Sequence, residues 1–215
     1  MRLYLDLETL RPKRDEAFID EKIILAGFLR DETPYAESSL REDVEPVFFS
    51  EWKEGSEEKV ITSSRAFLEQ MLRDHRFTVV VGFNILRYDI PLHVARAADY
   101  KVPIADHSKM WYDTRTMDYL QILLPANRSL FKGLRLDRIV AKAKELGLNP
   151  PEPYGTGADI AEWYRSQEYD KILTHCTQDL RIARWLDLYG ASRLIAESAG
   201  RSEPLFRDQV QPASV

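Results

Sequence analysis

Two acidic residues lie close together near the amino end of the sequence, in the apolar stretch YLDLET at residues 4–9. Their alternation with Leu5 and Leu7 predicts a β-strand, in which residues i and i+2 point to the same face. Asp6 and Glu8 should therefore stand side by side, where their charges repel and burial adds to the cost of ionisation. A bound cation would relieve both costs, so this pair is a candidate metal site.

A third carboxylate, Asp89, lies in the stretch VVVGFNILRYDIPL at residues 79–92. The apolar run predicts a buried strand that ends at Gly82, and Pro91 is typical of the first turn of a helix. Ligands of open α/β sheets bind at the carboxyl ends of strands, which favours a functional role for Asp89. The alternative is that Asp89 only caps the helix, since Asp is a favoured N-cap residue.

The third stretch is ILTHCTQDLRIARWL at residues 172–186, where His175 and Asp179 are four residues apart. On a helix this spacing puts both side chains on one face. Apolar residues at helical spacing lie close to that face, which favours a position near the core. An exposed His–Asp ion pair is the alternative for this stretch taken alone.

The elements that must position these residues alternate along the chain. Strands are predicted at Met1–Leu7, Lys22–Leu29, Val44–Phe49 and Thr78–Gly82, with a short one near Met110–Asp113. Helices are predicted at Ser63–Asp74, Ile90–Ala98, Thr116–Leu124, Leu136–Leu146 and Tyr169–Tyr189, the last ending at Gly190, with a further one at Ser192–Ser198. Early consecutive strands favour antiparallel pairing, and later strand–helix alternation favours parallel pairing. We expect an α/β domain over residues 1–200, with a mixed sheet flanked by helices, and a flexible tail over residues 201–215.

Composition narrows the functional classes. The chain of 215 residues has a net charge of −5, which disfavours coating nucleic acid by bulk charge but permits a local groove for one strand end. No apolar run reaches the length of a membrane span. Cys176 is the one cysteine, and the sequence starts directly with a strand, so we expect a cytoplasmic protein and no membrane partner. No phosphate-binding GxxxxGK[ST] loop, zinc-type cysteine pattern or serine triad is present.

Together, the three stretches resemble the motifs of the DEDD (DnaQ-like) superfamily of 3′–5′ exonucleases, most closely the proofreading exonuclease domain of family B DNA polymerases. LDLET resembles the first motif, GFNILRYDIPL the second and HCTQDL the third. GLRLDRIVAKAKELGL resembles the helix between the second and third motifs, so the resemblance covers roughly residues 1–190. It implies an RNase H-like fold with a mixed five-stranded sheet, and hydrolysis that uses two divalent cations, Mg²⁺ or Mn²⁺.

The resemblance also implies roles for the candidate catalytic residues. Asp6 would bridge both cations, Glu8 and Asp179 would complete the site of the attacking water, and Asp89 would support the second cation. His175 would orient or deprotonate the water. The sequence departs from the family here, because His175 stands four residues before Asp179, where the family usually has tyrosine.

Substrate contacts follow from the same motifs. Leu7, Thr9 and Leu10 would hold the terminal nucleotide, Phe83 and Tyr88 could stack on bases, and Asn84 could contact the strand or tie the second motif to the site. Packing in the core is the alternative for Phe83. Arg128, Lys132, Arg135 and Arg138 form a basic run that could meet phosphates or simply be solvated. Asp113, Asp118 and Asp137 are more simply explained as helix caps.

The sequence thus predicts a free-standing 3′–5′ exonuclease acting on single-stranded or frayed DNA 3′ ends, in DNA repair or in proofreading in trans, with possible repair or replication partners. One alternative is an exoribonuclease on the same fold. Whether the substrate pocket accepts a 2′-hydroxyl decides between DNA and RNA. The other is a non-catalytic nucleic-acid-binding or scaffolding subunit, which only the histidine at the tyrosine position favours.

Overall fold

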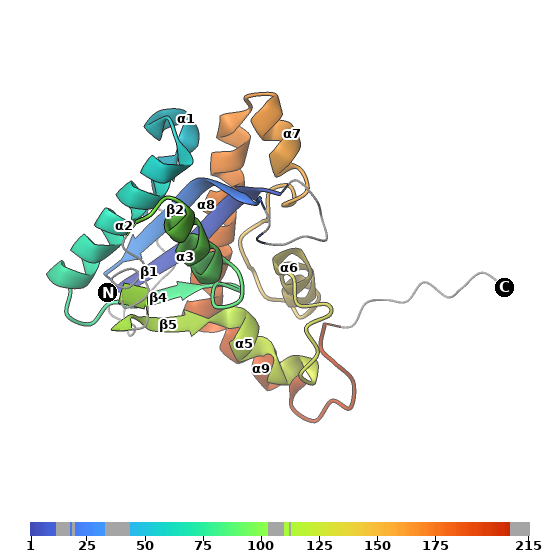
Figure 1. The fold of residues 1–215 in the computed structure, drawn as a ribbon. Coiled ribbons are helices and arrows are strands. Elements are labelled where there is room, and N and C mark those ends of the chain that lie inside the picture. The colour runs from blue at the N-terminus through green and yellow to red at the C-terminus, as the bar shows by residue number, and fades with distance from the viewer. Residues whose placement is uncertain (12–17, 19, 33–43, 103–109, 112, 207–215) are drawn as a thin grey trace.

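A five-stranded mixed sheet forms the centre of the protein, which is described here by a computed structural model of residues 1–11, 18, 20–32, 44–102, 110–111 and 113–206. The strands are β1 (Arg2–Leu10), β2 (Lys22–Asp31), β3 (Val47–Ser50), β4 (Val79–Gly82) and β5 (Arg115–Asp118). Their order in the sheet is β3-β2-β1-β4-β5, as Figure 1 shows. β2 is antiparallel to β1 and β3, whereas β1, β4 and β5 are parallel. The predicted mixed sheet is confirmed.

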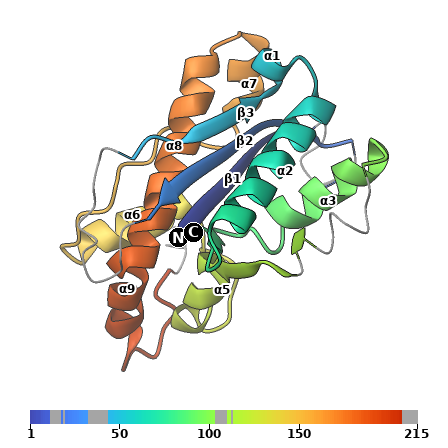
Figure 2. The ribbon, with the colours of Figure 1, turned by 90° about the vertical axis from the view of Figure 1, so that its left-hand side faces the viewer.

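Helices cover both faces of the sheet. They are α1 (Glu51–Glu54), α2 (Glu57–Asp74), α3 (Asp89–Asp99), α5 (Tyr119–Leu123), α6 (Leu136–Glu145), α7 (Ile160–Arg165), α8 (Tyr169–Trp185) and α9 (Ala191–Ser198). Figure 2 shows α2 and α3 on one side of the sheet and α8 on the other. None of the helices in the described ranges is long and apolar enough to cross a membrane.

The alternation of side chains along β1 divides its residues between the two faces. Leu3, Leu5 and Leu7 are buried in the core cluster that includes residues of α2. Tyr4 belongs to the opposite cluster, which includes Cys176 of α8. Because Asp6 and Glu8 have the same parity as Tyr4, they face α8.

The strand predicted near Met110–Asp113 is wrong. Residues 110, 111 and 113 are helical, and the fifth strand lies at Arg115–Asp118, where it pairs with β4. The helix predicted over Thr116–Leu124 consequently starts later, at Tyr119. Its start is fixed by Asp118, whose carboxylate accepts a hydrogen bond from Leu120 N at 2.9 Å. The prediction that Asp118 is a helix cap is confirmed.

The long helix predicted at Tyr169–Tyr189 is also divided differently. α8 ends at Trp185, and a π-helical turn over Leu186–Gly190 leads directly into α9. Gly190 does not stop the helix, since its backbone keeps helical angles. A Cβ at this position would lie 2.5 Å from the Trp185 ring, so glycine is needed here for close packing.

The start of the predicted tail is packed on the domain. Leu205 and Phe206 are buried, and Phe206 N donates a hydrogen bond to Asn127 Oδ1 at 3.0 Å. A Cβ on Gly133 would collide with the Phe206 backbone. Leu205 and Phe206 of the predicted tail are therefore packed on the domain, and residues 207–215 lie outside the described residues.

Candidate metal centre

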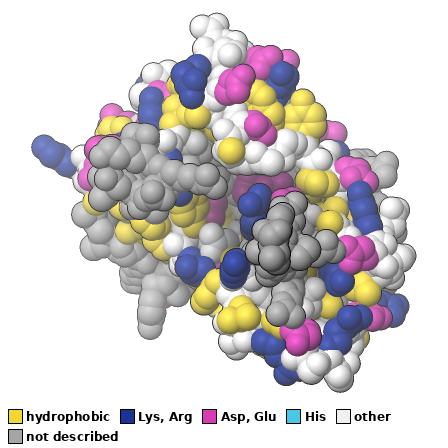
Figure 3. Space-filling view, turned by 90° about the vertical axis from the view of Figure 1, so that its right-hand side faces the viewer, with side chains coloured by type: hydrophobic (Ala, Val, Ile, Leu, Met, Phe, Trp, Pro, Cys, Tyr) yellow, Lys and Arg dark blue, Asp and Glu magenta, His cyan; other side chains and the backbone are white. Residues whose placement is uncertain are grey.

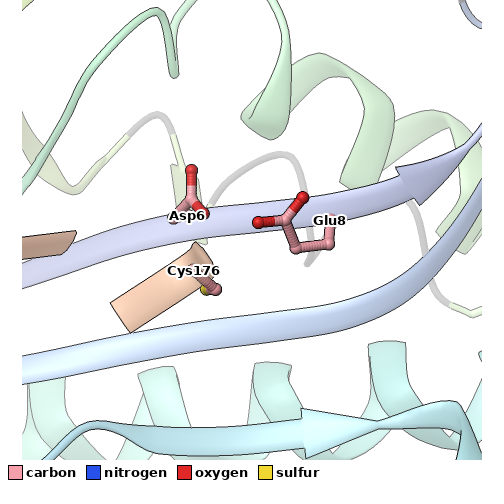
Figure 4. Close-up of side chains that lie close together, drawn as sticks. All are labelled: Asp6, Glu8 and Cys176. Carbon is pink, nitrogen blue, oxygen red and sulfur yellow. The ribbon is translucent and has the colours of Figure 1, made fainter. Parts of the chain in front are cut away.

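Asp6 and Glu8 meet a residue of α8 on the buried face of β1. Carboxylate oxygens of Asp6 and Glu8 and the sulfur of Cys176 all lie within 4.8 Å of one another. Figure 4 shows the three side chains converging from the strand and the helix. Glu8 is 6% exposed and Cys176 is completely buried, whereas Asp6 is partly exposed. The i, i+2 spacing along the strand therefore places one buried and one half-buried acid side by side.

Asp89 is held against the same segment of β1 from the other side. β4 pairs with β1 at Arg2, Leu3 and Tyr4 and ends at Gly82. Further along β1, Leu7 N donates its hydrogen bond to Asp89 Oδ1 at 2.9 Å. The N-cap of α3 is Tyr88, and Asp89 is the first helical residue, so the N-cap alternative for Asp89 is wrong.

His175 lies between two of these acids. Its Nε2 atom is 3.7 Å from Glu8 Oε1 and 3.8 Å from Asp179 Oδ2. Its Nδ1 atom is 2.5 Å from the carbonyl oxygen of Tyr154. Because a carbonyl can only accept, the neutral imidazole carries its proton on Nδ1, and the Nε2 lone pair faces the carboxylates. His175 is buried, which excludes the alternative of an exposed ion pair with Asp179.

The four candidate carboxylates share one electrostatic environment. Burial raises the pKa of Asp6 well above its ordinary value, and the charges of Asp179 and Asp89 raise it further. Burial also raises the pKa of Glu8, to which Asp6 adds the largest charge effect. The pKa of Asp89 rises to about 7 through burial, against the opposing effect of the Leu7 hydrogen bond. Burial raises the pKa of Asp179 to about 6, and this rise is opposed by His175 when the imidazole is protonated.

Two oxygens of this group fit a cation. Among the described residues, neither Asp6 Oδ2 nor Glu8 Oε1 has a hydrogen-bond partner, and both atoms are buried. Buried polar atoms normally have partners, and the exceptions call for an explanation such as an ion. Carboxylate oxygens are the ligands that Mg²⁺ and Mn²⁺ prefer. The donor set therefore fits hard divalent cations, with Cys176 as one soft donor beside them.

The predicted substrate residues Thr9 and Tyr88 take part in a network around Glu21. Thr9 Oγ1 donates to Glu21 Oε1 at 2.7 Å, and the Tyr88 hydroxyl contacts both Thr9 and Glu21. Arg11 donates to the Tyr88 hydroxyl at 2.8 Å and lies over its ring, which Phe18 also contacts. This network connects the end of β1, after a β-bulge between Glu8 and Thr9, to the start of α3.

The other predicted substrate residues lie around the same strand end. Leu7 is buried, while Leu10 and Phe83 are partly buried against the core cluster on the α8 side. Asn84 adopts a left-handed backbone with φ of 67°, which asparagine tolerates well. In the part of the chain that is described, its side-chain Oδ1 is buried without a hydrogen-bond partner.

Several structural supports of the site were missed from the sequence. Asp118, for which a helix cap was the favoured prediction over a supporting role at the site, also accepts hydrogen bonds from Asn84 N at 2.8 Å and Leu86 N at 3.0 Å, and so shapes the turn before Asp89. The Glu21 network and the Tyr154 carbonyl had no sequence signal. Arg87 lies 4.2 Å from the centroid of the exposed Phe131 ring, a contact that Phe131's place in the basic run could have suggested.

The surface around the site is mixed in charge. Figure 3 views the side toward which β1 runs in Figure 1, and acidic side chains lie in a recess near its middle with Lys and Arg side chains nearby. Within the predicted basic run, Arg135 pairs with Asp137 at 3.1 Å and Arg128 bonds to the carbonyl oxygen of Arg201. These two residues are therefore already engaged within the protein.

Comparison of the sequence with models of known protein families gives no match, and comparison with curated proteins gives no significant match. The site geometry is thus the basis for the function proposed below.

Proposed function

We propose that this protein is a metal-dependent 3′–5′ exonuclease of the DEDD type, with an RNase H-like fold, that hydrolyses DNA from single-stranded or frayed 3′ ends. The observation that carries the proposal is the pair of acids side by side on β1, where carboxylate oxygens of Asp6 and Glu8 have no hydrogen-bond partner among the described residues. Asp89 of α3 is bonded to Leu7 N between them, and His175 of α8 lies between Glu8 and Asp179. The sheet, with three antiparallel strands followed by two parallel ones, is consistent with that fold.

Four residues would hold the cations: Asp6, Glu8, Asp89 and Asp179. Two bound divalent ions supply activation of the attacking water and stabilisation of the leaving alkoxide. The protein holds the donors in place, since Asp6 and Glu8 are fixed by the pleat of β1 and Asp89 by its hydrogen bond to Leu7. The mutual repulsion that raises the pKa of Asp6 favours cation binding over an empty acidic site.

His175 would act on the attacking water. With its proton held on Nδ1 by Tyr154, Nε2 can accept a proton from water, and Glu8 and Asp179 can stabilise the imidazolium that results. We expect His175→Ala to lower the single-turnover rate by about 10²–10⁴-fold, the usual contribution of general-base catalysis. His175→Tyr, which restores the family's usual residue, should recover part of that loss. A rate for His175→Ala within about threefold of wild type would remove this role.

The substrate strand would leave the site over the Arg87–Phe131 pair. This pair joins the turn before α3 to the loop before α6, and Leu86 and Leu130 beside it are also exposed. An exposed aromatic ring backed by a guanidinium offers bases a stacking surface and phosphates a charge. The 3′ end of the strand would then reach the acids and their cations past a cationic and aromatic rim.

A labelled-strand assay tests the activity. With Mn²⁺ or Mg²⁺, a 5′-labelled single strand should shorten progressively, and a 3′-labelled strand should release labelled mononucleotide first. EDTA and the variant Asp6→Asn should abolish both results. Degradation from the 5′ end, or none under any metal condition, would overturn the proposal, and faster digestion of a matched RNA would reassign the substrate.

A further inference from the structure

Cys176 lies beside the acid pair, held by close packing against β2 and by a hydrogen bond between its thiol and Asp6. Gly27 of β2 lies opposite Asp6 in the sheet. A Cβ on Gly27 would come within 2.4 Å of Cys176 Sγ, so the absence of a side chain there makes room for the sulfur. The thiol is therefore held over the strand, where it approaches the carboxylates of Asp6 and Glu8.

The sulfur adds a soft donor to a group of hard ones. Thiolate ligands select Zn²⁺ and related cations, whereas Mg²⁺ and Mn²⁺ prefer oxygen. Zn²⁺ accepts sulfur and carboxylate oxygen together and needs few ligands, whereas Mg²⁺ demands six positions with several waters. An independent observation points to a ligand here: Glu8 is more than nine-tenths buried, and its Oε1 lacks a hydrogen-bond partner within the described ranges.

We propose that Asp6, Glu8 and Cys176 form a mixed oxygen–sulfur site that binds a thiophilic divalent cation of the Zn²⁺ and Cd²⁺ class. As the metal–sulfur bond forms, the thiol proton passes to solvent, so two carboxylates and one thiolate face the cation. Because Asp6 and Glu8 also belong to the proposed nuclease site, this cation competes with Mg²⁺ and Mn²⁺. That competition rests on the proposed function, whereas the binding itself does not.

Cadmium is a direct probe of the sulfur ligand. The full metal-free chain is titrated with Cd²⁺ while the ultraviolet band of sulfur-to-cadmium charge transfer is followed. Cys176 is the one cysteine in the sequence, so any such band reports on this thiol alone. We expect a band that saturates at one equivalent of Cd²⁺. Cadmium binding without the band would overturn the proposal.

Two variants separate the sulfur from the oxygens. Cys176→Ser should remove the band and weaken Cd²⁺ binding by about tenfold or more, with a much smaller change in Mn²⁺ affinity. Asp6→Asn keeps the thiol and should raise the Cd²⁺ concentration at half-saturation of the band. An unchanged midpoint in Asp6→Asn would show that the thiol binds cadmium outside the shared site, which contradicts the proposal whatever the stability of Cys176→Ser.

The result can be distinguished from failure of the nuclease assignment. If the strand assay shows metal-dependent exonuclease activity but no charge-transfer band forms, the mixed site is wrong and the proposed function stands. If the band forms in a protein without nuclease activity, the mixed site stands and the proposed function falls. In an active protein, micromolar Zn²⁺ should inhibit in the presence of excess Mg²⁺, and Cys176→Ser should require more Zn²⁺ for the same fractional inhibition.

Discussion

Acidic side chains at the two ends of the contact between β1 and the α8 region differ in their hydrogen-bond partners. At the end near the chain start, Asp187 accepts hydrogen bonds from the hydroxyls of Tyr4 and Tyr119, each at 2.7 Å. Arg2 Nε lies 3.5 Å from the same carboxylate. Each oxygen of Asp187 thus has a donor, and its charge has a cation.

Further along the same strand face, the acids face one another instead. Asp6 and Glu8 each have a buried oxygen without a hydrogen-bond partner among the described residues, and their charges raise the pKa values of the group. Asp187 and Glu8 are buried to a similar degree, so burial does not separate the two cases. The difference lies in the partners: Asp187 has a hydrogen-bond donor for each oxygen, whereas Asp6 and Glu8 each lack one, and we propose that a cation takes that place.

The largest effect on activity should follow from removing the charge of an acid that lacks a hydrogen-bond partner. Asp6→Asn should lower exonuclease activity by about 10³-fold or more, because a shared cation ligand is lost. The metal-free melting temperature should stay the same or rise, since the substitution removes repulsion. Rates on a 5′-labelled strand and thermal unfolding check this. Normal activity, or a marked loss of stability, would mean that Asp6 is a structural acid like Asp187.

At Asp187, whose oxygens both accept hydrogen bonds, we expect a loss of stability rather than of activity. Asp187→Ala removes the acceptor of the Tyr4 and Tyr119 hydroxyls and a charge that pairs with Arg2 in the core. We expect it to lower the free energy of unfolding by about 3–5 kcal/mol, as when one partner of a buried ion pair is removed. Urea unfolding measures the loss. The folded fraction of the variant should keep the wild-type exonuclease rate. A decrease in the free energy of unfolding of less than about 1 kcal/mol would contradict the structural role of Asp187.

The pH dependence of stability should follow the unsatisfied acids. Burial raises the pKa of Asp89 to about 7 and that of Asp179 to about 6, against about 4 in the unfolded chain. The folded state then binds more protons at these two groups, so they make the metal-free protein lose stability as pH rises from about 4 to about 7. Asp6 and Glu8, whose pKa values are also raised by burial, act in the same direction. We expect the melting temperature to fall by roughly 5 °C or more across this window.

Comparing melting temperatures with and without Mn²⁺ separates the titration of these acids from that of other groups. Bound cations replace the protons, so the difference in melting temperature with and without Mn²⁺ should grow from pH 5 to pH 8. A difference that is constant with pH would show that the raised pKa values do not belong to the cation site.

The smallest expected effect concerns the rim of the site. Phe131→Ala should weaken binding of a single strand by about 1–3 kcal/mol, the usual value of stacking on one base. Phe77→Ala is the matched control, since Phe77 is also exposed beside arginine side chains but lies just before β4, at the end of the sheet where β1 and β4 begin. Fluorescence anisotropy with a catalytically inactive variant measures both. Equal losses in the two variants would contradict a strand path over Phe131.

The fold could be predicted where patterns are long and repeated. The apolar runs of β1, β2 and β4 and the helical spacing of α8 identified these elements and their pairing. β5 was misplaced because its four residues, RTMD, carry no apolar run, and its position depends on pairing with β4. Gly190 was misread because a packing constraint from Trp185 and a helix stop look the same in sequence.

The acids of the site could be predicted, but not the groups that hold them. Spacing alone put Asp6 beside Glu8 and His175 beside Asp179. The partners of Asp89 and His175 are main-chain groups, Leu7 N and the Tyr154 carbonyl, which any residue type would supply. Such contacts depend on tertiary structure, so composition and periodicity carry no signal of them.

Anomalous diffraction from crystals grown with Mn²⁺ would show whether the four acids bind cations. We expect an anomalous peak at the manganese edge that is enclosed by carboxylate oxygens of Asp6, Glu8, Asp89 and Asp179. Saturating Mn²⁺ with no peak between these side chains would contradict this expectation, as would a peak found only elsewhere on the protein.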